Sequence, residues 1–340
     1  MKDGVISKQD FPQFLNHLKK NAKVFAPVVT NGEAGFKEWS EEDSVEFSYS
    51  NLKLSPKGLF FPQTETILSF DAGSVEEVPS HEEKMVVFGS RPCDSRALTF
   101  LDKIFSEENK GYNDPYYMNR RENAVMISLA CSDPCRTCFC SSLGSGPADE
   151  AGSDIVCFDL GDKLYLKAVT EKGELTIKDA GKVLSPGDES VRKDAEKQTA
   201  EALESMNNLE ADLPSVKKNM DDSFDDPVWD RLTRNCIGCG ACTYLCPTCY
   251  CFDISDEERM YKGKRIRTWD SCQYASFTKH ASGHNPRKNK KERLRQRFMH
   301  KLSYTVENQG EVFCVGCGRC ITQCPVNIDI REIITTFAEK

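Results

Sequence analysis

Two runs of cysteines in the last third of the chain constrain its fold more than any other feature. The runs are Cys236-Ile-Gly-Cys239-Gly-Ala-Cys242-Thr-Tyr-Leu-Cys246-Pro and Cys314-Val-Gly-Cys317-Gly-Arg-Cys320-Ile-Thr-Gln-Cys324-Pro. Both have the spacing C-x2-C-x2-C-x3-C-P. The small residues between the cysteines let the backbone approach a bound group closely and point N–H groups at the sulfur atoms. The sequence therefore predicts two short loops that each surround a group held by thiolates.

This spacing is the bacterial ferredoxin pattern for cubane iron–sulfur clusters, in which the fourth cysteine of each run binds the other cluster. The pattern predicts two [4Fe-4S] clusters. Cluster A would be bound by Cys236, Cys239, Cys242 and Cys324. Cluster B would be bound by Cys314, Cys317, Cys320 and Cys246. The alternative is two zinc sites, but zinc sites usually combine two separated cysteine pairs rather than four cysteines in one run that ends in proline.

Length and composition limit the other possibilities. A chain of 340 residues is long enough for two domains. Its net charge of −8 argues against nucleic acid as the main partner. No apolar run approaches the roughly 20 residues of a membrane span, and the N-terminus lacks the apolar core of a signal peptide. The 17 cysteines cluster in metal-ligand spacings rather than as a disulfide framework, which predicts a reducing cytoplasm with little oxygen.

The N-terminal half has the alternating pattern of an α/β domain. Two short apolar runs, the Val-rich residues 85–89 and residues 124–130, predict buried strands. Gly161-Asp162 predicts a hairpin between two further strands, and residues 188–209 predict an exposed helix before an acidic linker over 213–227. We therefore expect an N-terminal α/β domain with a mixed sheet over residues 1–225. An α-helical ferredoxin-like dicluster domain would follow over 226–340, with a long insertion over 252–310.

A third group of cysteines follows the two predicted strands. Cys93 comes after the first strand, and Cys131, Cys138 and Cys140 come after the second. Because sites collect at the carboxyl ends of parallel strands, these four thiols predict a third iron–sulfur cluster, called the third site below. Cys135 is then a spare or substitute ligand. Cys131, Cys135 and Cys138 also have the spacing of radical-SAM enzymes, but the flanking sequence lacks the repeated strand–helix units of a SAM barrel.

A fourth group lies between the two cysteine runs. Cys249, Cys251, Cys272 and His284 form a possible site, called the fourth site below, for a single iron or zinc ion, which thiolates and one imidazole suit. The alternative is thiols packed beside a cluster and histidines hydrogen-bonded in the core. Residues 287–297 are strongly basic, which is typical either of a surface that docks an acidic partner or of a solvated amphipathic helix.

Several longer strings carry a resemblance to a known family. They are Arg91-Pro-Cys93-Asp94, Cys246-Pro-Thr-Cys249-Tyr-Cys251-Phe, Trp269-Asp-Ser-Cys272 and Arg295-Gln-Arg-Phe-Met-His-Lys301. With them, nearly the whole chain resembles the iron–sulfur subunits that include the β subunit of sulfhydrogenase-type nickel–iron hydrogenases and the A subunit of anaerobic sulfite reductase. The family pattern is similar to the third site at Cys93, Cys131, Cys138 and Cys140.

The resemblance implies an electron-transfer subunit of a multi-subunit oxidoreductase rather than a catalyst. Its partners would be a flavin-containing reductase subunit linked to NAD(P)H or ferredoxin, and a catalytic subunit of hydrogenase, sulfite reductase or heterodisulfide reductase type. The sequence itself has no dinucleotide fingerprint, no Walker loop and no recognisable catalytic set. Two other classes remain open: a stand-alone iron–sulfur enzyme that uses the Cys131–Cys140 site, and a zinc-binding interaction module.

Overall fold

The computed structural model describes residues 2–79, 83–107 and 111–340, and it divides into two compact units. The N-terminal unit comprises Met1–Phe60, Ser80–Asn207 and Val315–Cys317. The C-terminal unit comprises Phe61–Pro79, Asn208–Cys314 and Gly318–Lys340. The chain therefore enters the C-terminal unit three times and returns to the N-terminal unit twice, the second time for only three residues, whereas the sequence suggested one boundary near residue 225.

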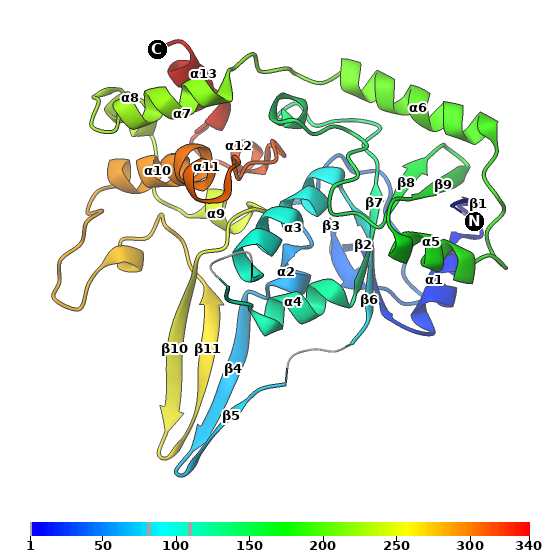
Figure 1. Cartoon of the computed structure of the whole chain (residues 1–340), viewed down its shortest axis with the longest axis horizontal. Coiled ribbons are helices and arrows are strands. Elements are labelled where there is room, and N and C mark those ends of the chain that lie inside the picture. The colour runs from blue at the N-terminus through cyan, green and yellow to red at the C-terminus, as the bar shows by residue number, and fades with distance from the viewer. Residues whose placement is uncertain (1, 80–82, 108–110) are drawn as a thin grey trace. The chain divides into compact units, whose positions relative to one another are not determined.

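A seven-stranded sheet forms the centre of the N-terminal unit, with the strand order β1-β9-β8-β7-β6-β2-β3 (Figure 1). Its strands are β1 (Asp3–Ser7), β2 (Lys23–Thr30), β3 (Glu33–Glu38), β6 (Met85–Ser90), β7 (Ala124–Leu129), β8 (Ile155–Asp159) and β9 (Lys163–Ala168). Strands β2, β6, β7 and β8 are parallel neighbours, while β1, β3 and β9 pair antiparallel. The predicted α/β domain with a mixed sheet is confirmed.

Helices cover both faces of this sheet because successive strand residues point to opposite sides. On one face, α1 (Phe11–Lys19) and α5 (Glu171–Asp179) share a core cluster with alternate residues of the central strands, such as Val86 and Ile127. On the other face, α6 (Glu189–Glu204) packs Val191 against β8 and β9. The remaining helical segments are α2 (Lys57–Phe60), α3 (Pro92–Phe105), α4 (Pro115–Glu122) and a 3-10 turn at Cys140–Leu143.

The C-terminal unit combines helices with an antiparallel four-stranded sheet in the order β10-β11-β4-β5 (Figure 1). The strands are β4 (Thr64–Asp71), β5 (Ser74–Glu77), β10 (Phe252–Arg259) and β11 (Lys262–Trp269). A buried ion pair at 2.5 Å joins Arg267 to Glu65 across β11 and β4. The predicted insertion thus begins as a hairpin, and residues 61–79 join this unit because β4 pairs with that hairpin.

The helices of this unit surround the two cysteine runs. They are α7 (Leu213–Asp222), α8 (Val228–Thr233), α9 (Ala241–Tyr244), α10 (Lys290–Met299), α11 (Thr305–Gln309), α12 (Arg319–Thr322) and α13 (Ile330–Ala338). A 3-10 turn occupies Ser276–Thr278, and a π-helix at His300–Tyr304 continues α10. The dicluster domain is therefore helical as predicted, with the four-stranded sheet as an addition. No described helix combines the length and apolarity needed to cross a bilayer.

Helix α7 corrects the prediction of an acidic linker over residues 213–227. Asp212 caps this helix by accepting a hydrogen bond from the backbone N–H of Ser215, at 3.1 Å. Val216 and Met220 lie one turn apart and are buried, and the helix packs against α13. The high charge of the segment concealed this short apolar stripe, because only two of its positions face the core.

Candidate metal centres

The two cysteine runs have the same backbone conformation. Gly238 and Gly316 have positive φ values of 72° and 62°. Gly240 and Gly318 have φ values of 78° and 73°, each with ψ of −7°, and lead directly into α9 and α12. Only glycine adopts such values without a steric cost. The repeated spacing therefore reflects a repeated turn that presents three cysteines from one loop.

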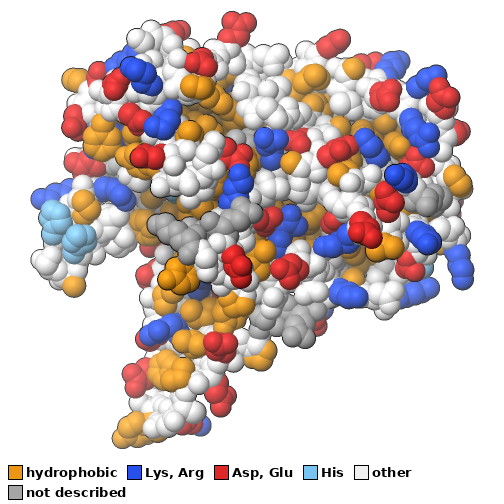
Figure 2. All heavy atoms as spheres, in the orientation of Figure 1, with side chains coloured by type: hydrophobic (Ala, Val, Ile, Leu, Met, Phe, Trp, Pro, Cys, Tyr) orange, Lys and Arg blue, Asp and Glu red, His pale blue; other side chains and the backbone are white. Residues whose placement is uncertain are grey.

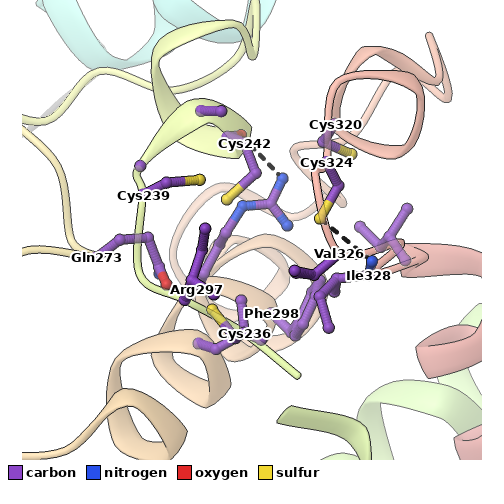
Figure 3. A pocket seen from close by; sticks show the side chains of 15 residues that line it. Cys236, Cys239, Cys242, Gln273, Arg297, Phe298, Cys320, Cys324, Val326 and Ile328 are labelled. Carbon is purple, nitrogen blue, oxygen red and sulfur yellow. Dashed lines mark hydrogen bonds between the residues drawn. The ribbon is translucent and has the colours of Figure 1, made fainter. Parts of the chain in front are cut away.

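The predicted ligands of cluster A lie around one cavity in the C-terminal unit (Figure 3). The cavity is lined by the cysteines Cys236, Cys239, Cys242, Cys320 and Cys324. Leu294, Phe298 and Val326 contribute apolar walls. Backbone N–H groups point at two of the sulfurs, from Gly238 to Cys236 at 3.4 Å and from Ile328 to Cys324 at 3.2 Å. The structure therefore brings together all four predicted ligands of cluster A, together with Cys320 of cluster B.

The predicted ligands of cluster B are divided between the two units. Cys246, Cys314 and Cys320 belong to the C-terminal unit, and Cys317 belongs to the segment Val315–Cys317 of the N-terminal unit. Cys246 is buried, and its sulfur lies 3.2 Å from the Thr248 hydroxyl. A hydrogen bond from Cys249 lowers the pKa of the Cys246 thiol, against the opposing effect of burial. This set of four ligands stays a prediction.

Two buried cations stand beside these thiols. Arg297 and Lys301 are each 3% exposed and lie one turn apart on α10 and the following π-helix. Arg297 lines the cavity of cluster A and donates to the carbonyl of Cys242 at 3.1 Å, while its Nε atom is buried without a hydrogen-bond partner (Figure 3). Lys301 donates to the Thr248 hydroxyl at 2.7 Å and to the carbonyl of Phe313 at 3.0 Å.

No carboxylate of the described residues forms an ion pair with either cation. Burial alone would lower the pKa of Lys301, but the negative charges of Cys246 and Cys249 outweigh it and raise that pKa. The same balance, with Cys242 and Cys320 as the main anions, raises the pKa of Arg297. A buried charge is costly unless an opposite charge compensates it. Ionised cysteines that carry an anionic cluster would supply that compensation, so the residues present fit an iron–sulfur group.

The third site assembles within the N-terminal unit. Strands β6 and β7 are parallel neighbours, and Cys93 lies in the first turn of α3 after β6 while Cys131 follows β7. The charges that act on the Cys138 thiol are those of Cys135, Cys93 and Cys140. Cys135 also forms a hydrogen bond with Cys138. Cys140 is influenced by Cys131. The strand-end argument thus brings the predicted thiols into one neighbourhood, and Cys135 joins them.

These thiols disfavour each other's ionisation. The hydrogen bond with Cys135, burial and the nearby thiols all raise the pKa of Cys138. Burial and the charge of Cys131 raise the pKa of Cys140 to about 12. Like charges crowded in a poorly solvated space need a positive centre, and a metal supplies it because a coordinating thiol is deprotonated outright. The donor set therefore fits a metal cluster better than a group of unrelated core thiols.

Arg91 fixes the strand end that carries Cys131. Its guanidinium is 4% exposed and donates to the carbonyls of Leu129 at 3.1 Å and Ala130 at 2.8 Å. It also stacks over the Tyr49 ring, at 4.2 Å from the ring centroid. Arg91 therefore satisfies the last carbonyls of β7 where the sheet ladder ends and the cysteine loop begins.

The predicted fourth site is only partly assembled. Cys251 and Cys272 hydrogen-bond through their side chains and line a pocket with Tyr250, Arg287 and His300. Hydrogen bonding from Cys251 lowers the pKa of Cys272 to about 6. The other two predicted ligands have different neighbours. Cys249 hydrogen-bonds to Cys246, and the exposed His284 ring lies 5.3 Å from the His280 ring.

The described residues contain no group of three or more His, Cys, Asp or Glu side chains that converges on one point, as a single metal ion requires. A cubane differs, because each thiolate binds a separate iron, so its ligands surround a cavity. Within the described residues no disulfide joins any of the 17 cysteines. The cluster sites therefore need cysteines spread around a cavity, whereas the fourth site needs ligands that converge on one point.

The basic stretch over residues 287–297 is not a simple charged surface. Arg293 and Arg297 are buried, and Arg295 lies over the Phe224 ring at 3.7 Å and donates to the Phe224 carbonyl. Figure 2 shows Lys and Arg side chains interspersed with Asp and Glu over the visible face. These arginines hold α10 in place, so the stretch is not a uniformly exposed basic face.

Sequence reasoning missed the roles of Arg297 and Lys301. A signal was present, because they share a helical spacing with Leu294 and Phe298, which are apolar and buried. Cations that occupy the apolar face of a helix require a buried counter-charge. The need for a counter-charge was missed because Arg297 was treated as part of the basic stretch over residues 287–297.

The fold and its thiol-lined sites define a dicluster iron–sulfur protein. The family described as 4Fe-4S dicluster domain matches residues 235–328, which contain both cysteine runs. The chain is 32% identical over 333 residues to the protein called sulfhydrogenase 2 subunit beta of Pyrococcus furiosus, an alignment that covers 97% of this chain and 96% of the relative. The chain therefore belongs to the family of sulfhydrogenase beta subunits, which confirms the resemblance inferred from the sequence.

Proposed function

We propose that this chain is the electron-transfer iron–sulfur subunit of a multi-subunit oxidoreductase. The observation that carries the proposal is the cavity lined by Cys236, Cys239, Cys242 and Cys324. The buried Arg297 lies in its wall and forms no ion pair with a carboxylate of the described residues. This arrangement suits a buried anionic group that changes charge by one electron. The sequence offers no separate set of residues for activating a substrate.

The proposed cofactors are two [4Fe-4S] clusters at the cysteine runs and a third iron–sulfur cluster at the third site. Such clusters supply one-electron oxidation and reduction. The chain's own residues would hold them in place and set their environment. Backbone N–H groups such as that of Ile328 bond to sulfur, Leu294 and Phe298 exclude water, and Arg297 and Lys301 offset negative charge.

The partners follow from the family rather than from the site. The relative in Pyrococcus furiosus is by its name one subunit of a sulfhydrogenase, so we infer partner subunits here as well. We propose a flavin-containing reductase subunit linked to NAD(P)H or ferredoxin on one side. On the other side would be a catalytic subunit of hydrogenase, sulfite reductase or heterodisulfide reductase type. We also propose that the complex works in the cytoplasm of an anaerobic cell.

The test is an oxygen-free purification of the native complex, with every partner identified and iron and sulfide measured per copy of this chain. Three cubanes predict about 12 iron atoms. About 8 would remove the third cluster from the proposal. Colourless protein with zinc in place of iron would favour an interaction module. A chain that is purified alone and turns over a substrate without partners would contradict the proposal as a whole.

The proposal includes a single iron or zinc ion at the fourth site. Cys249 and His284 would have to move toward the Cys251–Cys272 pair to complete it. Elemental analysis of the wild type and of Cys272→Ser tests this separately from the clusters. One metal ion per chain that is lost in the variant supports the site, whereas an unchanged metal content removes it.

A radical-SAM enzyme is the second candidate, because Cys135 contacts Cys138 and completes the three-cysteine spacing with Cys131. The sheet that carries these residues is mixed, with antiparallel strands at its edges, rather than a repeated parallel barrel. Incubation of the reduced protein with S-adenosylmethionine separates the two functions. Release of 5′-deoxyadenosine would establish the radical enzyme, and its absence would leave electron transfer.

A further inference from the structure

A three-residue segment of the second cysteine run packs within the N-terminal unit, directly on the loop of the third site. The backbone N–H of Phe139 donates to the carbonyl of Gly316 at 2.8 Å. The sulfur of Cys138 lies 3.7 Å from the carbonyl oxygen of Cys317. The side-chain amide of Asn51 donates to that same oxygen at 2.9 Å. The loop that carries a predicted ligand of cluster B is therefore bonded to the loop that carries two predicted ligands of the third site.

The backbone at Gly316 approaches the loop of the third site too closely to leave room for a side chain. A Cβ atom at this position would lie 2.6 Å from the backbone nitrogen of Cys140 and from the carbonyl carbon of Phe139. Its φ of 62° also favours glycine. The equivalent glycine of the first run is Gly238, and its φ is nearly the same. The nearest atoms to a Cβ added at Gly238 lie at 3.8 Å, which is an ordinary contact distance. The requirement for glycine at Gly316 thus comes from the contact as well as from the turn.

We propose that this contact is the route by which the third site exchanges electrons with the second cysteine run. The inference rests on the proposed function, because it assumes that the third site and cluster B both hold iron–sulfur clusters. Phe139 lies between Cys138 and Cys140, and Gly316 precedes Cys317. The path from ligand to ligand therefore contains short covalent segments and one hydrogen bond. Covalent and hydrogen bonds conduct electrons through protein better than gaps do.

The proposal fixes the order of the sites. By this route the third site exchanges electrons with the second cysteine run, to whose Gly316 its loop is bonded, rather than directly with the first run. In each transfer one site is oxidised by one electron and the other is reduced by one. No bond forms or breaks, and the Phe139–Gly316 hydrogen bond needs no proton exchange. The bond remains when Cys138 binds iron, because its donor is a backbone N–H rather than the thiol.

The experiment compares Gly316→Ala with Gly238→Ala in the full chain within its native complex, purified without oxygen and fully reduced. Electron paramagnetic resonance then reports the spin–spin splitting between reduced neighbouring clusters. We expect the splitting of the third-site signal to be reduced in Gly316→Ala, because the added methyl separates the two loops. It should be unchanged in Gly238→Ala, in which the methyl lies at ordinary contact distance, 3.8 Å, from its nearest neighbours. An unchanged splitting in Gly316→Ala, or an equal reduction in both variants, would overturn the proposal.

A second pair of variants decides the order if Gly316→Ala does not fold. Cys314→Ser removes a ligand of cluster B, and Cys236→Ser removes one of cluster A. We expect the third-site splitting to be lost in Cys314→Ser and kept in Cys236→Ser, and the reverse result would overturn the proposed order. Iron analysis distinguishes a failure of the proposed function from a failure of the proposed route. A wild type with no third-site iron or signal contradicts the proposed function and the route with it, whereas a full iron content without the splitting contradicts the route alone.

Discussion

The two cysteine runs share their spacing and their backbone turn, yet they occupy opposite environments. Ile237, between the first two cysteines of the first run, is 56% exposed, while Val315 at the equivalent place is 2% exposed. The second cysteine shows the same contrast, since Cys239 is exposed and Cys317 is buried. The spacing therefore determines how each loop turns but not what covers it.

The contrast indicates a division of roles. The second run is hydrogen-bonded through Gly316 to the loop of the third site, so one of its predicted ligands, Cys317, follows a residue bonded to a second predicted redox site. The first run presents Ile237 and Cys239 to solvent, which leaves its predicted cluster accessible to a redox partner. We therefore expect electrons to cross the surface of the subunit near the first run and to pass inward through the second.

The largest expected effect is the loss of a whole cluster. Cys239→Ser should lower the iron content by about 4 atoms per chain, because a cubane contains four irons and needs its thiolates. It should also destabilise the C-terminal unit, because cluster binding contributes to folding. Iron analysis and visible absorption measure both effects against Cys317→Ser. The second variant should lose a similar amount of iron and, in addition, the splitting of the third-site signal.

Cys157→Ala is the control for both cysteine variants. Cys157 is fully buried in the core of the N-terminal sheet, and burial raises the pKa of its thiol. We expect an unchanged iron content in this variant. Normal iron in Cys239→Ser, or iron loss in Cys157→Ala, would contradict the assignment of the clusters to the two runs.

The next effect is a shift of reduction potential at the first run. Arg297→Met removes a buried positive charge from the wall of the cluster A cavity, so the reduced cluster, which is more negative, becomes harder to form. A unit charge about 8 Å away at an effective dielectric constant of about 20 contributes about 2 kcal/mol, or about 90 mV for one electron. Redox titration followed by electron paramagnetic resonance should show one cluster potential lowered by about this amount.

Arg297→Lys is the matched variant for this titration. It keeps the charge but loses the planar fork that reaches the Cys242 carbonyl. We expect its cluster potential to stay close to the wild-type value. Equal shifts in the Met and Lys variants would mean that Arg297 acts by shape or hydrogen bonding rather than by charge.

The same titration extends the comparison to the second run. Lys301 lies near Cys246, Cys249 and Cys314, so Lys301→Met should lower the potential of cluster B. Shifts of the same cluster in both variants would contradict the expectation that Arg297 acts mainly on cluster A and Lys301 mainly on cluster B. In that case the two cations would form a single positive centre.

The sequence predicted local structural elements well and long-range placement poorly. The two apolar runs located β6 and β7, and the rule for strand ends correctly placed Cys93 in the neighbourhood of the loop after β7, near Cys138. By contrast, nothing local in residues 61–79 indicates that they pair with a hairpin nearly 200 positions away, since β-pairing partners are chosen by tertiary packing. Likewise, Val315–Cys317 has the same pattern as the first run, so its place in the N-terminal unit was not predictable from spacing.

The smallest expected effect concerns stability alone. Val315→Ala deletes two methyl groups from a buried site and should cost about 2 kcal/mol of unfolding free energy, while Ile237→Ala at an exposed site should change it by no more than about 0.5 kcal/mol. Urea unfolding without oxygen, followed by circular dichroism, measures both. Iron should remain complete in each variant, because neither side chain is a ligand. Equal losses would mean that the first run is also covered in the working protein. A partner subunit seated over Ile237 would have that effect, so the measurement on the isolated chain and on the native complex separates the folded subunit from its assembly.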